Sequence, residues 1–98
     1  MTASTTDSFH PLFPMGLLVA THGAADSLDP KEVACALRDH LMGHWGNECC
    51  EEDWEANDEA LKHGGRLLSF CRSKDCVKFY IVTEADRSVT TVLLPSEY

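Results

Sequence analysis

Basic residues, long hydrophobic runs and secretory signals are all scarce in this chain of 98 residues. Acids outnumber bases sixteen to eight, so the formal net charge is −8. Because nucleic acids and anionic membranes are polyanions, this charge argues against direct binding to either. No apolar run approaches the roughly 20 residues of a membrane span, and the first residues lack the basic and apolar regions of a signal peptide. We therefore expect a cytoplasmic protein with no membrane partner.

Metal, redox and nucleotide motifs are also missing. The chain has five cysteines but no CxxC pair, and an odd number without a secretory signal is typical of reduced, intracellular thiols. The isolated pair Gly64-Gly65 does not form the glycine-rich loop of a phosphate site. We expect no cofactor. The thiols are interpreted as small buried or incidental groups: Cys35, Cys49, Cys50, Cys71 and Cys76.

The overall composition, 44% hydrophobic and 24% charged, is that of one ordinary globular domain. Residues 1–14 combine serine, threonine and two prolines without periodicity, and we interpret them as a flexible N-terminal arm. Phe9, Leu12 and Phe13 give this arm apolar side chains that can dock on the domain or on a partner. Residues 15–98 are predicted to form the domain.

Two helices are predicted in the first half of the domain, after a short strand at residues 15–21. The first begins with Asp-Pro-Lys-Glu, in which Asp29 is the N-cap and proline takes the first helical position. Its apolar face repeats every four residues from Val33. The second helix is predicted over residues 47–63, with Asn47 as N-cap and a glycine pair as the stop.

The second half is predicted to be β structure. Residues 66–72, 77–83 and 88–94 are rich in β-branched, aromatic and aliphatic side chains, and short turns separate them. Three sequential strands with short connections form an antiparallel meander. The predicted fold is therefore an α+β domain in the order β-α-α-β-β-β. Its two helices would pack on one face of a three- to four-stranded, mainly antiparallel sheet.

Nearly all of the excess negative charge lies in the helical half. Residues 26–66 carry eleven acids against four bases, whereas residues 67–98 carry four of each. Around the second predicted helix, seven carboxylates fall in twelve residues with no lysine or arginine. A repeat every four residues places three of them about 6 Å apart along one stripe. The seven are Glu48, Glu51, Glu52, Asp53, Glu55, Asp58 and Glu59, and the stripe is Glu51, Glu55 and Glu59.

Two interpretations of this acidic segment stay open. A solvated face that keeps the protein soluble is the common meaning of a charge run. The alternative is a docking surface for a basic protein partner, since a row of carboxylates can occupy an arginine- and lysine-lined groove built for phosphates. Trp45 and Trp54 are most simply core anchors between helix and sheet, and either becomes a candidate binding residue if it is exposed.

Catalytic and metal-binding hypotheses have less support. His40 and His44 have the i, i+4 spacing of paired zinc ligands, but the segment lacks the glutamate of a His-Glu-x-x-His motif, and Gly43 predicts that the helix ends before His44. No motif for nucleophilic catalysis surrounds any cysteine. The turn at residues 84–87 is interpreted as structural, with Asp86 accepting hydrogen bonds from nearby backbone N–H groups. We predict neither a metal site nor an enzyme.

Several segments between Trp45 and Tyr98 match a recognisable pattern, above all residues 83–95 (TEADRSVTTVLLP). Shorter matching segments are Trp45-Gly46, Glu52-Asp53 and residues 57–61 and 64–69. In these segments the chain resembles a group of small bacterial proteins carried on plasmids, phages and integrative elements. The group has no established activity, so no residue inherits a role. The resemblance implies a mobile-element setting, in which small acidic proteins are often inhibitors of host defence that act by binding.

These features lead to one leading hypothesis and one alternative. The leading hypothesis is a small acidic interaction protein of mobile-element origin. It would bind and inhibit a basic, nucleic-acid-handling defence complex of the bacterial host, as anti-CRISPR, anti-restriction and DNA-mimicking proteins do. The alternative is a self-associating accessory protein, a homodimer that pairs through a sheet edge or through the apolar N-terminal arm. In that case the acidic helix is only a solvated face.

Overall fold

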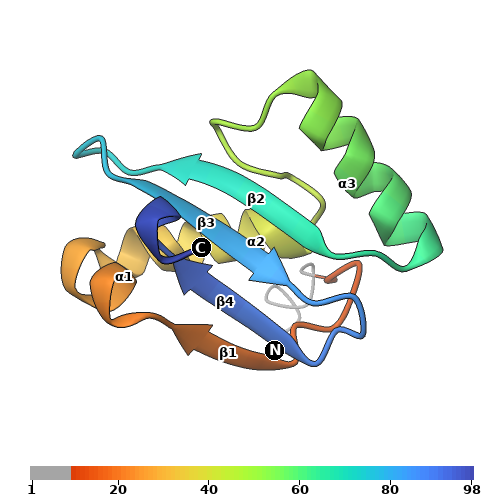
Figure 1. Cartoon of the computed structure of the whole chain (residues 1–98), viewed down its shortest axis with the longest axis horizontal. Coiled ribbons are helices and arrows are strands. Elements are labelled where there is room, and N and C mark those ends of the chain that lie inside the picture. The colour runs from red at the N-terminus through yellow and green to blue at the C-terminus, as the bar shows by residue number, and fades with distance from the viewer. Residues whose placement is uncertain (1–9) are drawn as a thin grey trace, which may run out of the picture.

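A four-stranded mixed sheet is the centre of the computed structural model, which describes residues 10–98. The strands are β1 (Leu17–Ala20), β2 (Leu67–Arg72), β3 (Lys78–Thr83) and β4 (Val89–Leu93). They lie in the spatial order β1-β4-β3-β2 (Figure 1). β1 runs parallel to β4, and the other two pairs are antiparallel. This sheet and the helices between β1 and β2 confirm the predicted α+β class and its order of elements.

The helices of the described chain are α1 (His22–Ser27), α2 (Pro30–Leu41) and α3 (Glu51–His63), and a 3₁₀ turn, η2 (Pro95–Glu97), follows β4. α2 begins as predicted, because the Asp29 carboxylate accepts a hydrogen bond from the backbone N–H of Lys31 and proline occupies the first turn. α1 is a short addition to the two predicted helices. Within residues 10–98, no helix has the length and apolar character needed to cross a bilayer.

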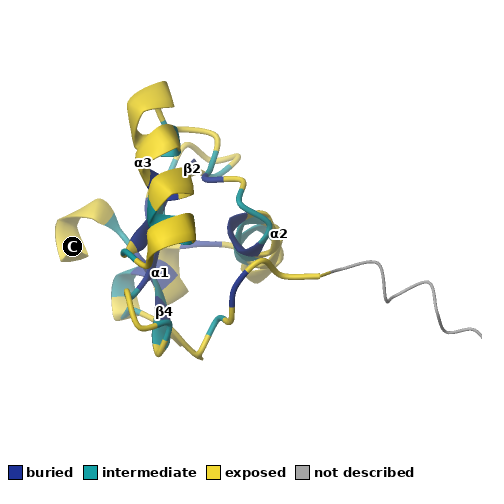
Figure 2. Cartoon of the chain, turned by 90° about the vertical axis from the view of Figure 1, so that its right-hand side faces the viewer, coloured by how far each residue is buried: buried dark blue, intermediate teal, exposed yellow. Residues whose placement is uncertain are grey.

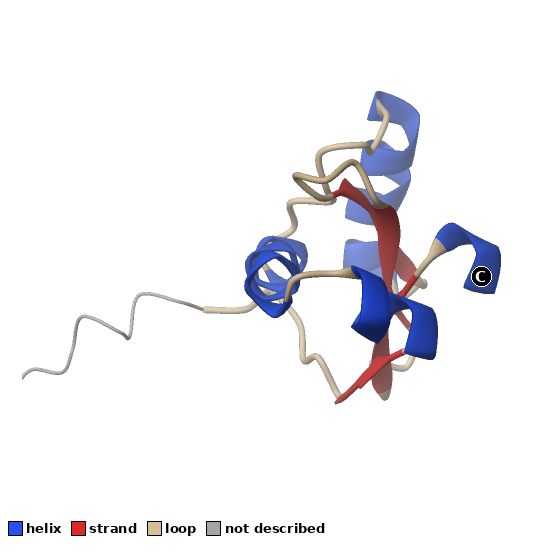
Figure 3. Ribbon diagram, turned by 90° about the vertical axis from the view of Figure 1, so that its left-hand side faces the viewer, coloured by secondary structure: helices blue, strands red, loops and turns tan. Residues whose placement is uncertain are grey.

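α1 and α2 cover one face of the sheet. Ala24 and Leu28 form a core cluster with Phe79, Ile81 and Val92, and apolar residues of α2 pack against it. Figure 2 and Figure 3 show α2 on one side of the sheet and the C-terminal turn on the other. Burial of this apolar surface, worth about 25 cal/mol per Å², stabilises the layer.

The prediction that both helices pack on one face of the sheet holds for α2 but is wrong for α3, which lies beyond β2 along the edge of the sheet (Figure 1). Its Asn57 side chain binds a single residue of β2 twice. The amide donates to the C=O of Leu68 at 2.8 Å and accepts from the N–H of Leu68 at 2.9 Å. Asn47 makes the same pair of hydrogen bonds to the backbone of Arg72, at 3.1 and 2.8 Å. Two asparagine side chains therefore take the place of a neighbouring strand.

The segment before α3 completes this edge. The backbone N–H of Phe70 donates to the C=O of Trp45, and the C=O of Phe70 accepts from the N–H of Glu48. Residues 45–48 therefore lie alongside β2. For this reason α3 begins at Glu51 and not at the predicted Asn47, whose side chain is held by β2.

The residues just before β1 dock on the domain. Phe13 is 6% exposed, and its ring lies 5.4 Å from that of His40 and 6.3 Å from that of Trp45. The guanidinium of Arg87 lies over the same ring. The backbone N–H of Leu12 also donates to the C=O of Leu41. Part of the predicted arm thus belongs to the core, whereas Phe9 lies outside the described residues.

Candidate binding surface on helix α3

Helix α3 turns one face to the core and a carboxylate-rich face to solvent. Trp54, Ala60 and Leu61 pack against the cluster around Trp45. Asn57, only 5% exposed, is the buried polar residue of this inner face. All seven predicted carboxylates are exposed. Most of α3 is coloured as exposed in Figure 2. The fold thus anchors α3 by one face and leaves the other available for contact.

The ends of α3 suit its charges. Glu51, Glu52 and Asp53 occupy the first turn, and Lys62 and His63 occupy the last. Carboxylates near a helix N-terminus and cations near its C-terminus interact favourably with the helix dipole, by about 0.3–1 kcal/mol each. Part of the acidic charge therefore stabilises the helix that carries it.

Four of the seven carboxylates already contact neighbours. The most important is Asp58, which accepts a hydrogen bond from the buried indole N–H of Trp45 at 3.0 Å. A buried donor without an acceptor destabilises a fold by about 1–3 kcal/mol, so Asp58 has a structural role. The other contacts are exposed, where ion pairs contribute little. They join Glu48 to Arg72 at 3.2 Å, Glu59 to His63 at 3.3 Å and Asp53 to the Cys50 thiol at 3.2 Å.

The other three carboxylates, Glu51, Glu52 and Glu55, are free. They are exposed, and no residue in the described part of the chain forms a hydrogen bond or an ion pair with their side chains. Their negative charge is therefore directed at solvent from the first half of a fixed helix. This group is the part of the predicted surface that the fold itself does not use.

Trp45 is a core anchor, the simpler of its two expected roles, and the structure removes it from the candidate binding residues. Its side chain is fully buried between Phe13, His40 and α3, so it cannot contact a partner. Trp54 is half-buried, and its ring stacks on that of His44 with 6.5 Å between centroids. Trp54 therefore remains the aromatic residue that borders the free carboxylates.

A buried chain of hydrogen bonds, not among the sequence predictions, links α2 to the sheet. The His40 ring lies 2.6 Å from Ser69 Oγ through Nδ1 and 2.9 Å from Thr83 Oγ1 through Nε2. The hydroxyls of Thr83 and Thr90 are 2.8 Å apart, and Thr90 donates to the C=O of Met15 at 2.7 Å. All four side chains are fully buried. These hydrogen bonds thus connect β2, β3 and β4 with the segment that leads into β1.

The direction of this chain follows from its last acceptor. A carbonyl only accepts, so the Thr90 hydroxyl donates to Met15 and accepts from Thr83. The Thr83 oxygen then accepts from the Nε2–H of His40, and Nδ1 accepts from Ser69. With a neutral imidazole, each ring nitrogen and each hydroxyl in this series of hydrogen bonds has a partner. Burial, together with the positive charge of Arg87, lowers the pKa of His40 to about 4.

The contact between Ser69 and His40 resembles that of an activated serine, but both side chains have no exposed surface. A nucleophile needs access to its substrate, so this pair holds the core together and does not form a reactive site. The clue in the sequence was His40 itself, which continues the apolar face of α2 between Leu37 and Leu41.

The remaining candidate ligands and nucleophiles are not brought together. His40 is buried and His44 is exposed beyond the end of α2, so the two do not share a face. Across residues 10–98, no group of three His, Cys, Asp or Glu side chains is placed to hold a metal ion. Burial raises the pKa of the Cys71 thiol to about 12, and burial with a neighbouring carboxylate raises that of Cys49 to about 11. Both thiols therefore stay protonated and unreactive near neutral pH.

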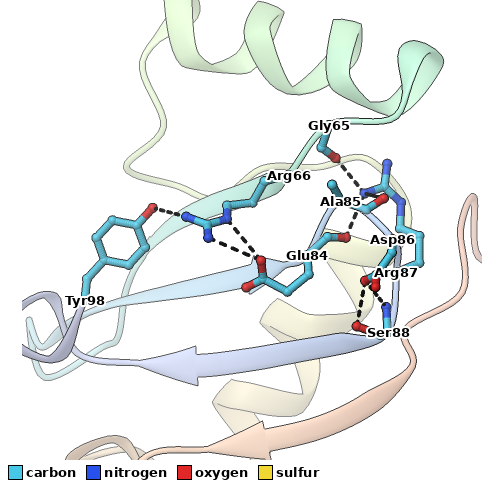
Figure 4. A network of polar contacts seen from close by, with 8 residues as sticks. All are labelled: Gly65, Arg66, Glu84, Ala85, Asp86, Arg87, Ser88 and Tyr98. Carbon is cyan, nitrogen blue, oxygen red and sulfur yellow. Dashed lines mark hydrogen bonds and ion pairs between the residues drawn. The ribbon is translucent and has the colours of Figure 1, made fainter.

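The turn between β3 and β4 is structural, as its sequence indicated (Figure 4). The Asp86 carboxylate accepts from the backbone N–H of Ser88 at 3.0 Å and from its hydroxyl at 2.6 Å. Arg87 donates to the C=O groups of Gly65 and Ala60, where its charge meets the negative end of α3. This turn therefore fixes the C-terminal end of the helix that carries the carboxylates. A neighbouring surface cluster joins Arg66, Glu84 and Tyr98.

No protein-family model, curated protein or solved structure matches this chain. Function must therefore be inferred from geometry and charge. The His40 chain, Asp58 and the turn at Arg87 all hold the structure together. The free carboxylates of α3 do not, and they form the candidate binding surface.

Proposed function

We propose that this chain is a non-catalytic, acidic interaction protein of mobile-element origin. It docks the outer face of α3 on a basic, nucleic-acid-handling defence complex of a bacterial host and inhibits it, as an anti-CRISPR or anti-restriction protein does. The observation that carries this proposal is the group Glu51, Glu52 and Glu55, which is exposed and has no partner within residues 10–98.

Anchoring of α3 supports this role. Asn57 ties the helix to β2, and Trp54 and Leu61 pack against the core. A partner then meets carboxylates on a fixed backbone, and less conformational entropy is lost on binding. An arginine- and lysine-lined groove that holds nucleic-acid phosphates provides the complementary charge and increases the association rate.

A cytoplasmic site of action belongs to the same proposal. All five cysteines are free thiols: Cys35, Cys49, Cys50, Cys71 and Cys76. Free thiols suit a reducing compartment, where bacterial nucleases and their nucleic-acid complexes act.

The test is affinity capture from bacterial lysate with two matched variants. The pair Glu51→Lys and Glu55→Lys reverses charge on α3. The pair Asp26→Lys and Asp75→Lys makes the same change in net charge at exposed positions outside α3. We expect the parent chain and the Asp26/Asp75 variant to retain one nucleic-acid-binding complex, identified by mass spectrometry, and the Glu51/Glu55 variant to lose it.

Three further measurements decide what the capture means. Excess duplex DNA and moderate salt should both release the complex, because phosphates compete for the same groove and salt screens the attraction. The captured complex should also bind DNA less well when the parent chain is added. Equal capture by the two variants would overturn the proposal and leave α3 as the solvated face of the alternative hypothesis.

A further inference from the structure

Strand β1 forms a bare apolar edge. Leu17, Leu18 and Val19 are 65%, 44% and 39% exposed, although all three are aliphatic. β1 is the last strand of the sheet order, and Figure 1 shows no other element of residues 10–98 beyond it. An exposed edge strand with neither charge nor proline is a template for pairing with another strand.

The backbone of β1 has hydrogen-bonding groups directed outward. The N–H of Leu17 donates to Ser88, and the N–H of Thr21 donates to Val92, so alternate residues face β4. In a parallel ladder the residues between them point the other way. The N–H and C=O groups of Leu18 and Ala20 therefore face away from the sheet, ready to bond a further strand.

The charge distribution indicates which partner strand would pair with β1. Residues 10–25 contain no Asp, Glu, Lys or Arg, and neither does β4 beside them. The free carboxylates lie on α3, beyond the opposite edge of the sheet. A chain of net charge −8 repels its own copies, and the residues of β1 add no charge to this repulsion. An uncharged, aliphatic strand is also complementary to itself.

We propose that β1 pairs antiparallel with β1 of a second copy of this chain. A twofold axis perpendicular to the sheet joins the two sheets into one continuous sheet and keeps both α2 helices on the same face. The outward groups then place Leu18 opposite Ala20 of the second copy as a hydrogen-bonded pair, repeated by symmetry. Val19 meets its own copy on the axis as a non-hydrogen-bonded pair, on the face opposite α2.

The inference of this dimer is independent of the proposed function. The dimer also leaves the outer face of α3 accessible to a partner. α3 lies at the β2 edge, so the two α3 helices stand at the two far ends of the joined sheet. The dimer therefore presents two separated acidic surfaces. A partner complex with two basic sites would then be bound more tightly by the dimer than by a single chain.

Sedimentation and light scattering over a wide range of protein concentration test the proposal. We expect the parent chain to reach twice its 10.9 kDa mass. Val19→Lys places two like charges on the axis, and we expect at least about a tenfold rise in the dimer dissociation constant. Leu12→Lys is the matched control, because Leu12 is 54% exposed but lies outside β1. A parent chain that stays monomeric, or equal effects of the two substitutions, would contradict the dimer.

A cysteine cross-link tests the register independently of stability. In a background with the exposed Cys35, Cys50 and Cys76 changed to serine, Val19→Cys should oxidise to a covalent dimer. Non-hydrogen-bonded antiparallel pairs have Cα atoms about 4.5 Å apart, within the range of a disulfide. Leu12→Cys should not cross-link, and circular dichroism should show both variants folded. Cross-linking at both positions to the same extent would indicate random collision and overturn the proposed register.

Discussion

The two edges of this sheet differ sharply in how they end. At β2, every outward-facing residue has its backbone groups bonded: Leu68 by Asn57, Phe70 by Trp45 and Glu48, and Arg72 by Asn47. At β1, no described residue covers the outer side, and the strand is aliphatic and uncharged. The β2 edge thus follows the common rule that exposed edges are blocked, whereas the β1 edge does not.

The difference arises because polar side chains of the described residues bond the outer backbone groups of β2 but not those of β1. The asparagines that close β2 come from α3 and from the segment before it, so closing the edge also places the acidic helix. The β1 edge has no such cover. One edge therefore carries the charged surface, and the other carries the apolar surface on which we expect a second copy to dock.

The largest expected effect concerns Gly46, which lets residues 45–48 approach β2. Its φ is +101°, and a Cβ atom there would overlap the backbone C=O of Phe70. We expect Gly46→Ala to lower the free energy of unfolding by about 3–5 kcal/mol in urea titrations. Gly64→Ala is the matched control, with φ +86° and open space around the new atom, and should lose only about 1–2 kcal/mol. Similar losses at the two positions would show that segment 45–48 does not hold the β2 edge.

The amino-acid pattern was sufficient for the parts of the fold that are local. Asp29 and Pro30 start α2 where predicted, and β2, β3 and β4 form the predicted meander, because caps, turns and strand periodicity act over a few residues. The closing of β2 was not predictable in this way. Asn57 looks like any polar residue of an acidic helix until the fold brings Leu68 against it.

The candidate site divides in the same way. Exposure of the seven carboxylates followed from their pattern, but the engagement of Asp58 by Trp45 depends on contacts between separate segments. The i, i+4 spacing of His40 and His44 can be seen in the sequence, and it suggests paired metal ligands. His40 instead contacts Ser69 and Thr83, which come from strands far along the chain.

The second prediction concerns the His40 chain, which ties the two edges together from Ser69 on β2 to Met15 before β1. The pKa of His40 is lowered from 6.5 to about 4 in the fold, so the unfolded chain binds more protons between these values. Stability from this group is therefore complete above pH 6.5 and is lost as the pH falls toward 4. At about 1.36 kcal/mol per pKa unit, the loss reaches about 3 kcal/mol.

Urea titrations at several pH values check this loss. Carboxylates also titrate in acid, so the control is His40→Gln, which removes the imidazole and keeps all acids. We expect the variant to be less stable at neutral pH, because Ser69 and Thr83 lose a well-placed partner. Its stability should fall less steeply between pH 6.5 and 4 than that of the parent chain. Parallel pH profiles would show that His40 does not control the acid sensitivity.

The smallest effect comes from the two asparagines that close β2, which form a matched pair. Both bind the N–H and C=O of one β2 residue, but Asn57 is 5% exposed and Asn47 is exposed. Asn57→Ala leaves two part-buried backbone groups of Leu68 without partners, at a cost of about 2–3 kcal/mol. After Asn47→Ala, water can reach the freed groups, so the loss should stay near about 1 kcal/mol.

Hydrogen exchange at Leu68 and Arg72 separates these outcomes from a general loss of stability. The amide of each residue should lose protection in the variant that lacks its own asparagine and keep most of it in the other. If both amides lost protection together in either variant, the β2 edge would open as one cooperative unit. The contrast between the edges would then depend on α3 as a whole, and the two asparagines would act only by docking that helix.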